Sequence, residues 1–194
     1  MKTFLSAILS GIFISIGCIV NLKVGGVAGA VLFSFGLLSV CYYGVKLYTG
    51  TAGFVRVWWR DDWKSLFWIL VGNAVGCIIT SLAARESIPE IIEPAKAICD
   101  GRIARGIFSD ILLAIGCGII MTTAVQQYRE NKKVLTILVG VPVFILCGFA
   151  HSIADCFYYT TAGAWGNIWL IWLGEVFGNF LGCNINRCLI IKSN

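Results

Sequence analysis

The only histidine of the chain stands near an acidic residue inside an apolar segment. His151 lies in the stretch GFAHSIADC, residues 148–156, and Asp155 follows four positions later. An ionisable side chain in the middle of a membrane span costs free energy and marks a functional site by default, although a lone histidine is often a hydrogen-bonded core residue. Burial should keep the imidazole neutral and able to donate one hydrogen bond. A passing anion would stabilise the imidazolium, so a proton could pass to a weak-acid anion, which would cross an apolar constriction as a neutral molecule.

The composition indicates what surrounds this pair. The chain has 194 residues, of which 58% are hydrophobic and only 13% charged, and its mean hydropathy is +0.86. Soluble domains are about 45–50% apolar and about 25% charged, so we predict an all-α integral membrane protein whose partner is the lipid bilayer. The apolar runs are continuous, which favours helices over a closed barrel. The net charge of +5 is spread over the loops, so membrane topology explains it better than nucleic-acid binding.

Catalytic and metal-binding groupings are not evident in the sequence. Most of the nine cysteines lie within apolar runs and none forms a CxxC pair, so we interpret them as small packing residues. We find no nucleophile with a neighbouring base and no phosphate-binding loop. The sequence therefore predicts no enzyme, no metal and no cofactor.

Six segments are long and apolar enough to cross a membrane. They are residues 3–22, 26–48, 64–84, 104–127, 133–158 and 165–187. Residues 85–103 are mixed in charge and contain two of the three prolines, so we expect an interfacial connector there. We expect the protein in the inner (plasma) membrane of the cell. Most of the basic residues that flank the spans gather on one side, which predicts that both termini are cytoplasmic and that the connector lies outside.

Two matching motifs indicate an internal duplication. GNAVGC at residues 72–77 corresponds to GNFLGC at 178–183, and Gly11-Ile12-Phe13 corresponds to Gly106-Ile107-Phe108. Because each half contains three spans, the halves would enter the membrane from opposite sides, as two inverted repeats of about 1–84 and 104–187 within one pore domain, 1–194. Asn73 and Asn179 would be buried amides that bond backbone groups freed by a broken neighbouring helix.

Polar interruptions occur in the second and fifth spans. YYGVKLYTGTAGF, residues 42–54, interrupts the second, and GFAHSIAD interrupts the fifth. The offset between the GN motifs superposes Thr49 on Asp155 and Lys46 on Ser152. Helices broken at matched places indicate a transport site, because unwound backbone must line a cavity or be buried in protein. Lys46 would either add positive potential to the pore or extend to the cytoplasmic headgroups.

Four motifs in a fixed order resemble those of one known family. GFAHSIAD is similar to a fifth-helix histidine motif, KLYTG to a loop that breaks the second helix, RGIFSDILLAIG to a fourth helix, and the GN-x-x-G of the sixth span is also typical. The chain thus resembles the formate/nitrite transporter family, which includes hydrosulfide channels.

The resemblance implies an aquaporin-like protomer in a homopentamer, with one pore per protomer. It implies passage of a small monovalent anion or its weak acid, such as formate, nitrite or hydrosulfide. By motif position, His151 would be the central pore histidine and Thr49 the hydroxyl of the second-helix loop. The apolar constrictions would fall at Phe33, Leu37, Leu113 and Phe144, which without the resemblance would be interpreted as core or lipid-facing residues.

The chain departs from the family pattern at four positions. Ala150 replaces a glutamate, Asp155 and Asp110 replace asparagines, and Lys46 replaces a glutamate. Two carboxylates near His151 could discourage anions, and Lys46 could offset one of them. A basic residue of the outer mouth could correspond to Lys96 or Arg102. Two alternatives therefore stay open, namely a neutral-solute channel of the same architecture and a non-conducting membrane sensor or scaffold.

Overall fold

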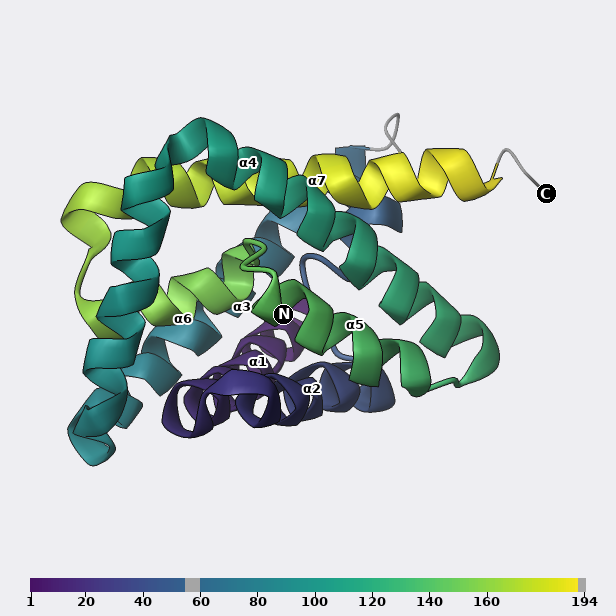
Figure 1. Ribbon diagram of the computed structural model, residues 1–194. Coiled ribbons are helices and arrows are strands. Elements are labelled where there is room, and N and C mark those ends of the chain that lie inside the picture. Colours follow the sequence, from purple (N-terminus) through teal and green to yellow (C-terminus); the bar gives the residue numbers. More distant parts are fainter. Residues whose placement is uncertain (55–59, 192–194) are drawn as a thin grey trace.

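The computed structural model describes residues 1–54 and 60–191, and every element in them is helical (Figure 1). The helices are α1 (Lys2–Val24), α2 (Gly26–Tyr43), α3 (Arg60–Ser87), α4 (Ile92–Asn131), α5 (Leu135–Leu146), α6 (Ser152–Ala162) and α7 (Trp165–Ile191), with short 3₁₀ turns η1 (Ala52–Phe54) and η2 (Pro89–Ile91). The all-helical class predicted from the continuous apolar runs is confirmed.

The apolar helices are long enough to span a bilayer at five places within these residues. The spans are Lys2–Val24, Gly26–Tyr43, Arg60–Ser87, Pro89–Asn131 and Ile168–Ile185, while α5 is apolar but shorter. The predicted fifth span, 133–158, is divided into α5 and α6, and neither reaches the length of a span. The predicted second span ends early, because α2 stops at Tyr43 and Gly44 takes a left-handed conformation.

Most of the predicted connector, residues 85–103, is helical. Residues 92–105 form the first part of α4, and the helix bends at Gly106, whose φ of 77° and ψ of 161° are not helical. Figure 1 shows this bend, after which α4 runs along α7. The first part of α4 also carries a buried cation, because Arg102 is only 5% exposed. Arg102 was expected in a charged connector, and its burial is explained by its carboxylate partners described below.

Glycines bring two pairs of helices into backbone contact. Gly11 of α1 lies so close to α3 that a methyl group there would collide with the carbonyl of Asn73, and Gly118 of α4 stands in the same relation to Asn179 of α7. The predicted match of Gly11 with Gly106 is therefore wrong, because Gly106 is at the bend and has open space around it, while Gly118 makes the contact equivalent to that of Gly11.

The Gly118→Ala change should destabilise the protein by forcing α4 and α7 apart. Overpacking of this kind costs about 1–3 kcal/mol. Gly101→Ala, in the same helix, meets no atom within 4 Å and should be neutral or slightly stabilising. Thermal unfolding of the two variants in detergent measures the difference, and equal midpoints would contradict the close packing of these helices.

Candidate functional site

The chain between α5 and α6 positions His151. Residues 147–151 are not helical, and Gly148 has a positive φ of 69°. His151 is the N-cap of α6, and its Nδ1 accepts a hydrogen bond from the Ala154 backbone N–H at 3.1 Å. A neutral ring nitrogen that accepts an N–H has no proton, so the proton is on Nε2. Nε2 lies 3.0 Å from Thr49 Oγ1 and therefore donates to this hydroxyl.

Thr49 comes from the irregular segment that follows α2. Its side chain is fully buried, and that of His151 is 1% exposed, so the pair forms inside the protein. The Thr49 backbone carbonyl accepts a hydrogen bond from the Cys183 thiol of α7 at 3.3 Å, which fixes the segment. Because Thr49 Oγ1 accepts from His151, its own hydroxyl proton can be donated to another acceptor. The two segments that interrupt the apolar spans thus meet at a donor pair.

Apolar side chains surround this pair. The Phe144 ring of α5 stacks on the His151 imidazole with centroids 5.6 Å apart and an interplanar angle of 26°. Phe33 of α2 meets Phe144 edge-on at 5.8 Å, and both rings are buried, as is Leu37. Leu113 is half-buried, and like Phe33 and Leu37 it is not among the residues that line the two cavities described below. Three of the four predicted constriction residues are therefore buried in the core, and the fourth, Leu113, is half-buried.

Asn73 holds the segment after α2. Its Nδ2 donates to the carbonyls of Ala7 at 2.8 Å and Lys46 at 2.9 Å, and its Oδ1 accepts from the Tyr48 backbone N–H at 2.8 Å. The Lys46 carbonyl and the Tyr48 N–H lie beyond the end of α2, so the buried amide supplies the partners that they would otherwise lack.

Asn179 does the same for the segment between α5 and α6. Its Nδ2 donates to the carbonyls of Ala114 and Ala150, both at 2.9 Å, and its Oδ1 accepts from the Ser152 N–H at 2.9 Å. The two asparagines therefore make the same set of bonds in two places.

These bonds correct the predicted superposition of the two interruptions. Lys46 corresponds to Ala150 and Tyr48 to Ser152 by contact, whereas the sequence offset had matched Lys46 with Ser152 and Thr49 with Asp155. The offset rests on the GN motifs of α3 and α7. The chain from Lys46 to Asn73 is two residues shorter than the chain from Ala150 to Asn179, so the same offset does not hold at the interruptions. The residue that matches Thr49 by contact is Ile153, whose carbonyl accepts from Cys77 as that of Thr49 does from Cys183.

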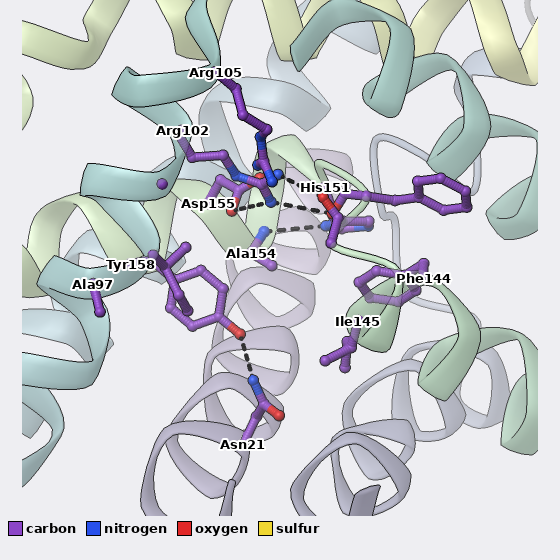
Figure 2. A pocket seen from close by; sticks show the side chains of 14 residues that line it. Asn21, Ala97, Arg102, Arg105, Phe144, Ile145, His151, Ala154, Asp155 and Tyr158 are labelled. Carbon is purple, nitrogen blue, oxygen red and sulfur yellow. Dashed lines mark hydrogen bonds and ion pairs between the residues drawn. The ribbon is translucent and has the colours of Figure 1, made fainter. Parts of the chain in front are cut away.

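Arg102 is the centre of a buried charge cluster (Figure 2). Its Nη2 donates to both carboxylate oxygens of Asp155, at 3.0 and 3.1 Å, and its Nη1 lies 3.4 Å from Asp110 Oδ1. Arg105 reaches the same Asp110 oxygen at 3.1 Å. Arg102 Nε also lies 3.9 Å from Glu175, which accepts a hydrogen bond from the Tyr159 hydroxyl.

Arg102 also supports the segment that carries His151. Its guanidinium donates to the carbonyls of Gly148 at 2.9 Å and Phe149 at 3.1 Å. The expectation that Lys46 offsets one carboxylate is wrong, because Lys46 is exposed and the cations that pair with Asp110 and Asp155 are Arg102 and Arg105. Asp110 and Asp155, the two acids that depart from the family pattern, are thus both paired with arginines.

Sequence reasoning missed Arg102, Arg105 and Glu175 as members of this cluster. A signal was present, since two carboxylates predicted inside a membrane protein require cations. Arg102 and Arg105 precede Asp110 by eight and five residues, and they are the basic residues nearest to it in the chain. The bend at Gly106 lies between Arg102 and Asp110 and brings these two residues, eight positions apart, into contact.

Two cavities lie beside the donor pair. The first, of about 220 Å³, is lined by His151, Phe144, Arg102, Arg105 and Asp155 among others, and Figure 2 shows these side chains converging on it. The second, of about 380 Å³, is lined by residues of α2, the segment after it and the last turns of α4, including Lys46, Leu47, Gly50, Arg129 and Lys132. Thr49 stands between Leu47 and Gly50 and bonds His151, so the buried pair links the walls of both cavities.

Known proteins resemble this chain in sequence. The family model described as formate/nitrite transporter matches residues 1–190. The formate channel FocA of Escherichia coli strain K12 is 24% identical over 184 residues, covering 81% of this chain and 65% of the relative. This chain therefore spans less than two thirds of FocA. The formate channel BtFdhC of Bacillus thuringiensis is 24% identical over 217 residues, covering 93% of this chain and 84% of the relative.

Solved structures share the fold. A pentameric formate channel with formate bound superposes with a TM-score of 0.78 at 21% identity, covering 99% of this chain and 94% of the other. An ion channel of the FNT family superposes with a TM-score of 0.90 at 17% identity, covering 99% and 89%. At such identities the likeness shows the fold alone, but the family model covers nearly the whole chain. The chain belongs to the formate/nitrite transporter family.

Proposed function

We propose that the protein is a membrane pore for a small monovalent anion or its weak acid, with formate, nitrite and hydrosulfide as candidate permeants. The observation that carries this proposal is the buried His151–Thr49 donor pair between two cavities, each lined by basic side chains. Family membership and the relatives named as formate channels support it.

The pore would be built from two inverted three-helix halves, about residues 1–84 and 104–187, joined by residues 85–103. The second and fifth crossing segments are broken in this proposal, and the paired bonding of Asn73 and Asn179 supports it, because each amide satisfies the backbone of one break. Six crossings are reached when α5 and α6 are counted as one broken segment. One domain then forms one aquaporin-like pore.

We further propose a homopentamer in the plasma membrane with both termini cytoplasmic. The similar solved structure described as a pentameric formate channel supports the oligomer, and the distribution of Lys and Arg supports the orientation. In this orientation the second cavity opens to the cytoplasm and the first to the outside. Lys46 would then raise the anion concentration at the cytoplasmic mouth.

The main barrier to an anion in this proposal is the apolar constriction at Phe33, Leu37, Leu113 and Phe144. A charge in a hydrocarbon environment costs about 3 kcal/mol or more, and a neutral acid avoids this cost. For His151 to protonate the permeant at Nε2, the ring needs a second proton on Nδ1, which must displace the bond from Ala154. Losing this hydrogen bond disfavours the imidazolium form of His151, and a nearby anion favours it. The imidazolium that can donate a proton therefore forms only when a permeant is present.

Uptake into vesicles tests the proposed function. The purified protein in liposomes should take up formate, nitrite or hydrosulfide faster than protein-free liposomes do, and faster at lower pH because each anion that crosses takes up a proton. Stopped-flow swelling with ammonia, urea or glycerol separates this from a neutral-solute channel. Uptake of none of the three anions would overturn the proposal, and the absence of all fluxes would favour a sensor or scaffold.

A further inference from the structure

The second cavity is strongly basic. Lys46, Arg129 and Lys132 line it, and none of its described lining residues is acidic. Among residues 1–54 and 60–191, no carboxylate pairs with any of the three. The first cavity differs, because its two arginines are bound to Asp110 and Asp155.

Two of these cations are held by aromatic rings of the same cavity. The Arg129 guanidinium carbon lies 4.8 Å from the centre of the Phe54 ring, and the Lys132 Nζ lies 5.3 Å from that of Tyr128. Such contacts orient a cation without neutralising it. Both positions therefore keep their charge available to a ligand.

The negative C-terminal ends of two helices offset only part of this positive charge. The last turns of α2 and α4 line the cavity, and α4 is capped by Lys132 itself. Each helix C-terminus carries about −0.5 of an elementary charge, so the two together offset about one of the three cations. About two positive charges remain, which match a divalent anion better than a monovalent one.

A ligand with two or more charges would stop in this cavity. In the proposed pore, the way onward passes Leu47 and Thr49 and then the constriction at Phe33 and Leu37, and all four residues are buried. A monovalent anion becomes neutral with one proton, whereas a divalent anion would stay charged after receiving one. The cost of placing that charge among apolar side chains then prevents its passage.

We propose that the second cavity binds small oxyanions with two or more negative charges, of the phosphate or pyrophosphate type, and that such an anion blocks permeation. Binding rests on the cavity itself, and the block rests on the proposed pore function. The anion would lie among Lys46, Arg129 and Lys132, and bound there it would close the mouth to monovalent ions.

The test measures formate uptake by the reconstituted protein at constant ionic strength with pyrophosphate on both faces of the membrane. Phosphatidylcholine vesicles carry no net headgroup charge, which removes lipid phosphate as an electrostatic competitor. The concentration of pyrophosphate that halves formate uptake should be at least tenfold lower than the concentration of chloride that does so. Equal potency of the two anions would overturn the block.

Variants locate the site. Lys46→Gln and Arg129→Gln each remove one charge, and Lys132→Asn removes one while keeping a residue that tolerates the left-handed conformation at φ 55°. Each should raise the half-blocking concentration about fivefold, as expected for one exposed ionic contact. Lys133→Gln removes an exposed charge one residue along, outside the cavity, and should change nothing. An equal effect of Lys133→Gln would contradict the site.

Binding is also measured without transport. The phosphorus resonance of pyrophosphate should broaden when the detergent-solubilised protein is added, and the three cavity variants should reduce the broadening while Lys133→Gln does not. If formate uptake is absent but broadening is seen, the pore function fails and the binding site stands. No broadening with the unaltered protein overturns the binding site.

Discussion

Replacing Arg102 by methionine is expected to abolish the stable folded protein. The change leaves Asp155 and Glu175 buried without their main cation and leaves Asp110 with Arg105 alone. Losing one partner of a buried ion pair costs about 3–5 kcal/mol, which is a large share of the roughly 5–15 kcal/mol that stabilises a folded protein. The segment that carries His151 also loses two hydrogen bonds to its carbonyls. The yield of monodisperse protein and its unfolding midpoint in detergent measure the loss.

A second substitution separates charge from packing. Asp155→Asn removes the carboxylate that Arg102 binds through two oxygens, so Arg102→Met combined with Asp155→Asn should recover part of the lost stability. Arg102→Met combined with the exposed change Glu93→Gln should recover none. An Arg102→Met protein as stable as the unaltered one would show that the cluster does not contribute to stability.

The His151→Asn change is expected to leave the fold intact and reduce formate uptake about a hundredfold. Asparagine is a good N-cap, so its side-chain oxygen can accept the Ala154 N–H as the imidazole does. It cannot deliver a proton, and an anion that stays charged at the constriction faces an additional barrier of about 3 kcal/mol, which corresponds to about a hundredfold in rate. The remaining uptake should no longer increase as pH falls, beyond the increase in protein-free vesicles.

Two related variants serve as controls for this result. Thr49→Val removes the hydroxyl that accepts from His151 but keeps the ring, so it should lower uptake and keep the pH dependence. Lys133→Gln changes an exposed residue that lines neither cavity and should leave uptake unchanged. A His151→Asn protein with normal uptake and normal pH dependence would remove His151 from the mechanism.

The sequence was sufficient for the class of the fold and for the two interruptions. Continuous apolar runs can only be helices in lipid, and the polar residues around Thr49 and His151 mark places where a helix cannot continue unsupported. Asn73 and Asn179 were identifiable because a buried amide needs partners, and two such amides in a repeated motif indicate a repeated need.

The charge cluster was not predicted, because it depends on a change in chain direction. Residues 85–103 look like a surface connector when their charges are counted along the chain. The bend at Gly106 brings Arg102 over the break between α5 and α6, which no local pattern indicates. The register of the two interruptions failed for a similar reason, since a sequence offset assumes linkers of equal length and the contacts show a difference of two residues.

The stoichiometry of formate and proton movement tests the central claim most directly. Vesicles that contain the protein are loaded with a pH indicator, and formate uptake and internal acidification are measured together while a potassium gradient with valinomycin sets the membrane potential. The account predicts one proton entering with each formate, at a rate that does not depend on the potential. Formate uptake that follows the potential without acidification, or no uptake above protein-free vesicles, would contradict it.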